Sequence, residues 1–383
     1  MTDNNENKVL NVPPLRFPEF TEEWKAEQLD NIATLSKGIG ISKEQLSEDG
    51  EPCILYGELY TKYKSEIIKQ VESKTDINGS KLKRSKANDV IIPCSGETAV
   101  DIATARCVPF DNILFGGGLN VISLHQYDGA FMSYQLNGKR KYDIARVAQG
   151  VSIVHLYGEH LKAIKTYNPT LPEQQKIAKL LSLLDDRIDT QNKIIEKLQS
   201  LIKGIAQHCI KESTSGNTYV KLGDICQITT GKLDANAQVD NGIYPFFTCA
   251  EQPFKIDSFA FDTEALLISG NGANLGYINY YKGKFNAYQR TYVLDLFSEN
   301  IQYIKWALKV LLPKRIAIEK SSSNTPYIVL STLTDLRLPI PCKSKQSFIA
   351  NLMQSLERKL SNQIAQYDSY NYLKQYLLRQ MFI

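Results

Sequence analysis

The strongest constraint on how this 383-residue chain folds is an internal repeat, in which the second half of the sequence resembles the first. Residues 24–38 read WKAEQLDNIATLSKG, and residues 219–231 read YVKLGDICQITTG. The positions that match at constant spacing are Leu29 with Leu222, Ile32 with Ile225, and Gly38 with Gly231. An internal repeat on this scale predicts two similar folded halves rather than one large domain.

A mixed segment of strands and turns follows in both halves. The first half contains VIIPCSG at 90–96 and ILFGGGLNVISL at 113–124, and the second contains ALLISGNG at 265–272 and FNAYQRTYVLDL at 285–296. Each pair is typical of a short buried strand that runs into a glycine turn, followed by a later strand. Together with the helices described next, this pattern predicts a mixed α+β fold.

A long helix is predicted at the end of the first half. It begins at Thr170–Glu173, a capping-box sequence with proline in the first turn, where the missing N–H costs nothing. Alternating steps of four and three then select a seam that is apolar except at Gln191: Ile177, Leu181, Leu184, Ile188, Gln191, Ile195, Leu198, Ile202, Ile205 and Cys209. A seam sustained over several heptads is typical of a coiled coil.

The second half ends in a matching helix, whose seam consists of Ile349, Met353, Leu356, Leu360, Gln363, Tyr367, Tyr370, Lys374, Leu377 and Met381. Gln363 occupies the position of Gln191, so we expect the two helices to pack together with these glutamines as a buried pair that fixes their register. Lys374 weakens the second seam unless its stem packs and its amine reaches solvent. The alternative is two separate amphipathic helices, each lying on its own domain.

The expected layout is two globular domains separated by two long antiparallel coiled-coil helices, with a pseudo-twofold relation between the halves. The predicted boundaries are 1–170 and 213–342 for the globular domains and 171–212 and 343–383 for the spacer helices. Each helix would be about 50 Å long at ~1.5 Å per residue. Such a spacer suits a bipartite target, for example half-sites ~34–36 Å apart on duplex DNA, although a protein with two epitopes fits equally well.

Composition narrows the class of protein only slightly. The 45 basic and 41 acidic residues give a net charge of +4, which permits nucleic-acid binding without arguing for it. No apolar run approaches the ~20 residues that a membrane span needs, and the polar N-terminus does not look like a secretory signal. Seven widely spaced cysteines without a Cys-x-x-Cys motif favour reduced thiols in the cytoplasm. The four histidines lack the spacing of metal ligands, so we expect no metal site.

The sequence offers no convincing catalytic motif. The glycine-rich stretch 111–118 resembles a methyltransferase cofactor loop, but 168–170 reads Asn-Pro-Thr where the accompanying motif requires a second proline. Asp335 with Glu357 and Lys359 loosely fits a nuclease pattern, yet the last two lie on the predicted coiled-coil helix, where there is no cleft. A phosphate-binding loop for ATP is missing. We therefore expect a chain that catalyses nothing itself.

Four sequence segments together resemble a known family. Residues 11–24 (NVPPLRFPEFTEEW), 171–178 (LPEQQKIA) and 377–382 (LLRQMF) match its opening, the start of its spacer helices and its ending, in that order. Residues 344–350 (SKQSFIA) are a degraded second copy of the helix-start motif that lacks the Pro-Glu pair. In order and position, this pattern resembles the specificity subunits of type I restriction–modification enzymes over the whole chain.

The resemblance implies that DNA recognition and catalysis belong to different subunits. In that family, each of two target-recognition domains reads one half of an asymmetric, interrupted DNA sequence, and the paired helices set the gap between the halves. Two methyltransferase subunits assemble on the specificity subunit to form an adenine-N6 methylase, and two motor–nuclease subunits complete the restriction enzyme. S-adenosylmethionine, ATP and Mg²⁺ would be bound by those partners and not by this chain, whose role would be double-stranded DNA recognition in bacterial defence.

Direct reading of bases needs rigidly held two-pronged donors or acceptors, and phosphate contacts need lysine, arginine, hydroxyls and backbone N–H groups. Polar or basic stretches that qualify are 56–63, 81–86 and 137–141 in the first half, and 269–274, 289–290 and 321–325 in the second. The residues predicted to contact DNA are Tyr56, Glu58, Tyr60, Thr61, Lys62, Lys81, Lys83, Arg84, Lys86, Lys139, Arg140, Lys141, Asn271, Asn274, Gln289, Arg290, Ser323 and Asn324. The alternative for each stretch is an ordinary solvated loop.

Two other classes of protein fit parts of this pattern. One is a coiled-coil adaptor whose two domains bind proteins, and the other is a nuclease or methylase fused to one recognition domain. The missing catalytic motifs disfavour the second class. Salt dependence distinguishes a protein-binding adaptor from a DNA-binding protein, because DNA binding through phosphates weakens steeply as the salt concentration rises.

Overall fold

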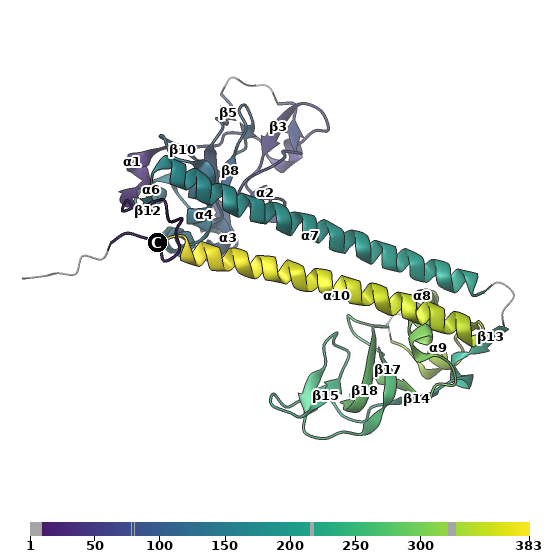
Figure 1. Cartoon of the computed structure of the whole chain (residues 1–383). Helices are drawn as coiled ribbons and strands as arrows, with labels where there is room; N and C mark the ends of the chain where they lie inside the picture. The colour runs from purple at the N-terminus through teal and green to yellow at the C-terminus, as the bar shows by residue number, and fades with distance from the viewer. Residues whose placement is uncertain (1–9, 78, 80, 215–217, 321–326) are drawn as a thin grey trace, which may run out of the picture. The chain divides into compact units, whose positions relative to one another are not determined.

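The computed structural model describes residues 10–77, 79, 81–214, 218–320 and 327–383, and the chain divides into two compact units (Figure 1). Unit 1 comprises the chain up to residue 192 together with 365–383, and unit 2 comprises 193–364. Each unit combines a β-rich part with a stretch of both long helices, α7 (Leu171–Glu212) and α10 (Lys343–Gln380). The predicted mixed α+β class is confirmed.

The remaining helices and strands are short, apart from one helix in unit 2. Those of unit 1 are β1 (Lys25–Gln28), α1 (Leu29–Ile32), β2 (Ala33–Lys37), η1 (Lys43–Gln45), β3 (Glu51–Ile54), α2 (Glu58–Thr61), β4 (Lys74–Thr75), β5 (Lys83–Arg84), β6 (Asp89–Pro93), β7 (Ser95–Gly96), α3 (Ala99–Ile102), β8 (Arg106–Val108), β9 (Leu114–Phe115), β10 (Leu119–Leu124), α4 (Gly129–Asn137), α5 (Lys141–Val147), β11 (Val154–His155), α6 (Gly158–Lys162) and β12 (Lys165–Asn168). Those of unit 2 are β13 (Thr218–Lys221), η2 (Leu222–Asp224), β14 (Gln227–Thr230), η3 (Ala235–Ala237), β15 (Tyr244–Phe247), β16 (Phe254–Ile256), β17 (Phe261–Ser269), β18 (Ile278–Ala287), β19 (Thr291–Asp295), α8 (Ile301–Lys320), α9 (Leu330–Thr334) and β20 (Arg337–Ile340).

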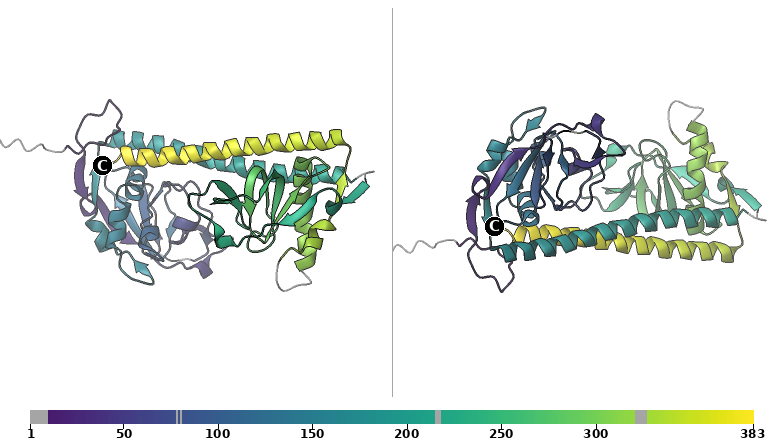
Figure 2. Two further views of the ribbon diagram at one scale, coloured as in Figure 1. Left: turned by 90° about the horizontal axis from the view of Figure 1, so that it is seen from below. Right: turned by 90° about the horizontal axis from the view of Figure 1, so that it is seen from above.

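The centre of unit 1 is an antiparallel sheet with the strand order β2-β10-β6-β8. Every residue of β6 is buried, because both faces of the sheet are covered. One face packs on Met132 and Leu136 of α4, and the other packs on Ile54 and Phe115 of a smaller sheet ordered β4-β3-β9-β5. Both views of Figure 2 show this part, in purple to blue, beside the stretches of α7 and α10 that belong to unit 1.

Unit 2 is built around a six-stranded sheet ordered β14-β19-β17-β18-β15-β16. Alternate residues of β17 point to opposite faces, as expected for a strand. Leu266 and Ile268 join the cluster of α8 residues that includes Tyr303 and Leu308, whereas Leu267 packs with the aromatic residues of the other face. The pairing of β13 with β20 repeats the pairing of β1 with β12 in unit 1.

The repeated glycines occupy the same place in both sheets. Gly38 follows β2, where an added Cβ would lie 2.1 Å from the carbonyl oxygen of Gly116, and Gly231 follows β14, where it would lie 1.9 Å from that of Ala287. Because these distances are far shorter than van der Waals contact, only glycine lets the two backbones cross. Both β2 and β14 pair antiparallel with a strand that begins just after the crossing. The sequence repeat is therefore a structural repeat.

Gly38→Ala and Gly231→Ala are each expected to lower the free energy of unfolding by about 2–4 kcal/mol, since the new methyl group must displace backbone atoms. Gly204→Ala is the matched control, because Gly204 lies on α7 with no atom within 4 Å of an added Cβ. That change should stabilise the helix by about 1 kcal/mol. Chemical denaturation measures all three effects. If neither Gly38→Ala nor Gly231→Ala lowers the free energy of unfolding, the two backbone segments do not approach each other as closely as described.

The two long helices begin in the same way. Gln174 near the start of α7 and Gln346 near the start of α10 are both 1% exposed. Their amide oxygens accept the backbone N–H of Asp128 at 2.9 Å and of Asn300 at 3.0 Å, respectively, and their amide nitrogens donate to the proline carbonyl five residues earlier. Asp128 and Asn300 in turn cap α4 and α8. The degraded second motif thus keeps a side chain that ties the helix to its domain.

Glu173 does not fill the capping role that the sequence predicted. Its carboxylate accepts hydrogen bonds from Nε and Nη2 of Arg16, both at 2.7 Å, and from Nε1 of Trp24 at 3.3 Å, rather than turning back to the N–H of Thr170. The carboxylate is buried, so this ion pair is held away from water. Glu173 of the first motif therefore anchors the segment 11–24 to the start of α7.

In both units the two long helices pack against each other. The seam residues that share apolar clusters are Ile177, Leu181, Leu377 and Met381 in unit 1, and Leu198, Ile202, Ile349 and Met353 in unit 2. The start of α7 meets the end of α10, so the predicted antiparallel pairing is confirmed and the alternative of two separate helices is wrong. Gln191 is 5% exposed and Gln363 is half-buried, but they belong to different units, and their pairing stays a prediction.

Candidate nucleic-acid interface

In unit 2, several loops meet at one end of the sheet, because β14, β15 and β17 end there and β19 begins there. The unit 2 loop cluster is defined here as residues 231–234, 248–252, 270–276 and 288–290. Backbone hydrogen bonds join neighbouring loops: the N–H of Gly270 donates to the carbonyl of Arg290 at 2.8 Å, and that of Gln289 donates to Leu233 at 2.9 Å. Loops fixed in this way to a rigid sheet can hold side chains in place for recognition.

The unit 2 loop cluster contains four residues predicted to contact DNA: Asn271, Asn274, Gln289 and Arg290. The Asn274 amide donates to the carbonyl oxygen of Cys249 at 3.0 Å, and the Asn271 amide oxygen accepts from the thiol of Cys249, also at 3.0 Å. Nε2 of Gln289 donates to Oδ1 of Asp234 at 2.7 Å. Arg290 is exposed, and within the part of the chain that the structure describes its guanidinium has no hydrogen-bond or ion-pair partner.

This arrangement is suited to reading base edges. An arginine with free donors can bind O6 and N7 of guanine together, and an amide can do the same with N6 and N7 of adenine. Arg290 has the required exposure, whereas Asp234 already orients the amide of Gln289. Ser323 and Asn324, which were also predicted to contact DNA, lie outside the described residues.

Unit 1 has a corresponding cluster at the same end of its own sheet, where β2, β3 and β6 end and β10 begins. The unit 1 loop cluster is defined as residues 38–44, 55–61, 94–98 and 116–118. The N–H of Cys94 donates to the carbonyl of Gly118 at 2.7 Å, as Gly270 donates to Arg290 in unit 2. Because 116–118 are three glycines, that loop contributes no side chains. The surface of the cluster is formed by residues of 38–44 and by the exposed Tyr56 and Tyr60.

The predicted stretch 56–63 divides into supporting and available side chains. Glu58 accepts the N–H of Leu55 at 2.9 Å and also binds the Ser73 hydroxyl and, at 3.4 Å, Lys62. These contacts make Glu58 and Lys62 part of the loop's own framework. Tyr56, Tyr60 and Thr61 are exposed instead and line a hollow of about 690 Å³. Burial raises the pKa of Tyr60, so its hydroxyl stays protonated near neutral pH and can act as a hydrogen-bond donor.

The basic stretch 81–86 borders the unit 1 loop cluster, because Lys83 pairs with Phe115 just before the three glycines. Lys81 and Lys86 are exposed and Lys83 is half-buried. Arg84 is already bound to Glu51, with Nη2 2.9 Å from Oε1, and this hydrogen bond lowers the pKa of the Glu51 carboxyl. The lysines are therefore better placed for phosphates than the arginine is.

The third predicted stretch of unit 1 lies apart from its loop cluster, between the end of α4 and the end of α10. Arg140 donates through Nη2 to the carbonyl oxygen of Ile383 at 3.0 Å and pairs with Asp143 at 3.2 Å. Burial lowers the pKa of Lys141, which is half-exposed, and Lys139 is exposed. The structure thus gives Arg140 a supporting role at the chain's end and leaves DNA contact by this stretch a prediction.

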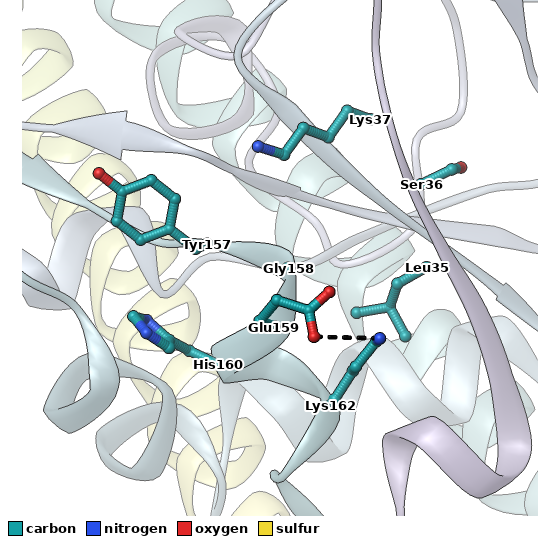
Figure 3. A pocket seen from close by; sticks show the side chains of 8 residues that line it. All are labelled: Leu35, Ser36, Lys37, Tyr157, Gly158, Glu159, His160 and Lys162. Carbon is teal, nitrogen blue, oxygen red and sulfur yellow. Dashed lines mark ion pairs between the residues drawn. The ribbon is translucent and has the colours of Figure 1, made fainter.

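A hollow of about 420 Å³ lies beside β2 and α6 of unit 1, outside every stretch predicted from the sequence (Figure 3). Lys37, the last residue of β2, extends its amine toward the ring of Tyr157, 5.9 Å from the ring centroid. Tyr157 also lies against His155 and His160, with ring centroids 6.1 and 5.5 Å apart. A cation beside a partly exposed ring suits nucleic-acid binding. The signal that could have identified Lys37 is its position directly before the repeated Gly38.

No described group of three or more histidine, cysteine, aspartate or glutamate side chains is arranged to hold a metal ion. All seven cysteines are free, and burial raises the pKa of Cys53 to about 11 and that of Cys107 to about 12. These two thiols therefore stay protonated and unreactive near neutral pH. Within the described residues, the helices are too short or too polar to cross a membrane.

A family model for the type I restriction modification DNA specificity domain matches the chain twice, over residues 21–200 and 214–367. The type I restriction enzyme EcoDI specificity subunit of Escherichia coli is 44% identical over 137 residues, which are 36% of this chain and 30% of that protein. The MjaIX specificity subunit of Methanocaldococcus jannaschii is 25% identical over 256 residues, covering 56% of this chain and 59% of the relative. The chain thus matches less than two thirds of either relative's length.

Two solved structures share the fold. The S subunit of a type I restriction–modification system from M. genitalium superimposes with a TM-score of 0.69 at 20% sequence identity, covering 97% of this chain and 99% of that one. A chain from a type I R-M system studied for its complex assembly and conformational transition gives a TM-score of 0.58 at 16% identity, covering 96% and 99%. At these identities, the likeness shows the fold alone.

Proposed function

Because the chain belongs to the family of type I restriction–modification specificity subunits, whose role is recognition and not catalysis, we propose that its two units read the two parts of a bipartite, asymmetric sequence in double-stranded DNA. The observation that carries this proposal is the repeated loop cluster. Both units place loops at the same end of a repeated sheet, and the family model matches once over each half. Two copies of one scaffold suit two parts of one target.

The side chains of the two loop clusters support an asymmetric target, because their chemistry differs. Unit 2 presents an exposed arginine and oriented amides, Arg290 and Asn274 among them, which suit hydrogen bonding to purine edges. Unit 1 presents Tyr56 and Tyr60 around a hollow, with lysines nearby, which suits shape, apolar and phosphate contacts. Two units with the same backbone fold but different loop side chains would recognise different DNA sequences.

The proposal extends to partners. Exposed apolar side chains remain on both long helices, at 52–71% exposure: Leu183, Leu201, Phe348 and Tyr372. Such residues are suited to burial against partner subunits. We expect two methyltransferase subunits and two motor–nuclease subunits, which would bind S-adenosylmethionine, ATP and Mg²⁺ in place of this chain. A subunit that directs methylation of host DNA would act in the cytoplasm.

The test of this function is co-expression of the chain with a type I methyltransferase subunit of its host, followed by mapping of N6-methyladenine across the genome. We expect methylation at one interrupted, asymmetric motif that disappears when the chain is omitted. A methyltransferase subunit that is active with another specificity subunit but marks no motif with this one would favour the protein-binding adaptor. Binding that is insensitive to salt would favour the adaptor as well.

Arg290→Ala is expected to weaken binding to the target by about 1–3 kcal/mol and to relax one base pair in the part that unit 2 reads. Arg337→Ala is the matched control, because it removes the same charge from an exposed position on β20, outside the unit 2 loop cluster. Methylation mapping and binding assays with the methyltransferase complex measure both effects. Equal behaviour of the two variants would show that Arg290 is not a base contact.

A further inference from the structure

Three charged side chains meet in the interior of unit 1. The amine of Lys374, from α10, lies 2.6 Å from Oε2 of Glu66 and 2.7 Å from Oδ1 of Asp185, which belongs to α7. These side chains are only 11%, 8% and 5% exposed, and the hydroxyl of Tyr134 donates to the second oxygen of Asp185 at 2.7 Å. From the sequence, Lys374 was expected to weaken the seam unless its amine reached solvent; in the structure the amine does not reach solvent but is paired with two buried carboxylates.

A second buried cation connects this cluster to the loop that carries the exposed tyrosines. Arg106 is 8% exposed and donates through Nε to the carbonyl oxygen of Leu59 at 3.2 Å and through Nη2 to that of Tyr63 at 2.8 Å. Leu59 directly precedes Tyr60 in α2, and Tyr63 lies two residues beyond the end of α2. The backbone beside Arg106 is bound to the same segment, because the N–H of Cys107 donates to the carbonyl oxygen of Glu66 at 2.8 Å. Burial opposes the charged form of the Glu66 carboxyl, but the attraction of Lys374, and to a smaller extent that of Arg106, lowers its pKa overall. The two cations and two carboxylates therefore join both long helices to the 56–63 stretch.

The fold does not require ions at this place. In unit 2, the matching position on the seam is Ile202, which is 6% exposed and packs in an apolar cluster with Met353. Glu357 matches Asp185, but among the described residues it pairs with two lysines of α8 and with none of the long helices: Lys305 at 2.7 Å, whose side chain is 9% exposed, and Lys309 at 3.2 Å. The Glu357 side chain itself is 33% exposed. Buried ion pairs rarely stabilise a protein more than apolar residues of similar size would, so their presence in unit 1 calls for another reason.

We propose that Lys374 is a positioning residue for DNA recognition by unit 1. Through Glu66 and Arg106 it fixes the 56–63 stretch relative to α7 and α10, so that Tyr56 and Tyr60 are presented in one orientation. Directional ion pairs and hydrogen bonds specify such an orientation, whereas an apolar contact would let the stretch slide. This inference rests on the proposed function, because it assigns to Lys374 a role in how accurately unit 1 discriminates among DNA sequences.

The experiment uses two variants of the full chain, each co-expressed with the methyltransferase subunit. Lys374→Met leaves two buried carboxylates without their cation, so we expect a lower Tm. The uncompensated carboxyls take up protons in the folded state, so their folded pKa values lie above the unfolded ones and the loss of Tm grows as pH rises from about 5 to 8. Lys179→Met, at an exposed position on α7, is the control and should behave as the wild type.

The second variant separates positioning from stability. Lys374→Met combined with Glu66→Gln and Asp185→Asn removes every charge of the triad, so the Tm should lose its pH dependence. The Tm should recover only in part, because Arg106 stays buried without a carboxylate beside it. This variant should nevertheless methylate sites that carry a wrong base pair in the part read by unit 1 about tenfold more than the wild type does, which is the order of effect of one mismatch. Methylation of sites with a wrong base pair in the part read by unit 2 should not change.

Two outcomes would overturn this inference while leaving the proposed function intact. One is wild-type discrimination by the neutral triple variant, which would make the triad purely structural. The other is equal relaxation in both parts of the target, which would show a general loosening of the chain. If the wild-type chain directs methylation to no bipartite motif, the proposed function fails and this inference fails with it.

Discussion

Leu181→Asp in unit 1 and Met353→Asp in unit 2 are each expected to lower the free energy of unfolding by about 4 kcal/mol or more. Both side chains are fully buried in apolar clusters that the two long helices share with their own β-rich part. An aspartate at either position must bury an unpaired carboxylate or take up a proton. Either way the helix pair loses its contact with that unit, so we also expect recognition of the DNA target to be lost.

Matched controls come from exposed positions on the same two helices. Thr190→Asp in α7 and Ser355→Asp in α10 add the same charge where the side chains are exposed. Chemical denaturation of the four variants gives the free energies, and methylation mapping reports on recognition. If the buried and exposed substitutions lower the free energy of unfolding equally, the two seams do not hold the helices together.

The helix pair was the part of the fold most open to prediction from sequence. A heptad seam is a local pattern, because residues three and four apart lie on one face of a helix. Ile177 and Ile349 start seams that the structure places in the cores of unit 1 and unit 2. Lys374 could not be interpreted in the same way, since its partner Glu66 is 308 residues away in the sequence. No pattern along one helix reveals such a partner.

The candidate site was predictable where a turn follows a buried strand. Asn271 and Arg290 lie in glycine-rich or polar turns next to β17 and β19, and the sheet brings those turns together. The supporting contact of Arg140 with Ile383 could not be predicted, because basic turns look alike in sequence whether they face solvent or contact the end of the chain after α10. Lys37 and Tyr157 escaped notice because they come from β2 and the start of α6, which meet only in the fold.

The structural repeat explains how one scaffold can present two different surfaces. The features that recur are those that hold the backbone: the crossings at Gly38 and Gly231, and the helix-start amides of Gln174 and Gln346. The features that differ are side chains at the loop ends. Selection for a new target in one unit can therefore change loop residues without disturbing the framework, because those residues carry little of the core.

Adding one heptad to each long helix is expected to lengthen the unread interval of the target by about three base pairs. The insertions would follow Asn192 in α7 and Ile364 in α10, at the boundaries between the two units. Seven residues add about 10 Å to a helix and preserve the heptad seam, and about 10 Å corresponds to three base-pair steps of ~3.4 Å. The sequences read by the two units should not change, since neither loop cluster is altered.

Methylation mapping of the double-insertion variant measures the interval directly. A variant with the heptad inserted in α7 alone is the control, because its seam falls out of step with α10 and recognition should fail. An unchanged interval with the double insertion would reject the idea that the helix pair sets the spacing. A longer interval between two unaltered sequences would show that spacing and reading belong to separate parts of the chain, so that each can be changed alone.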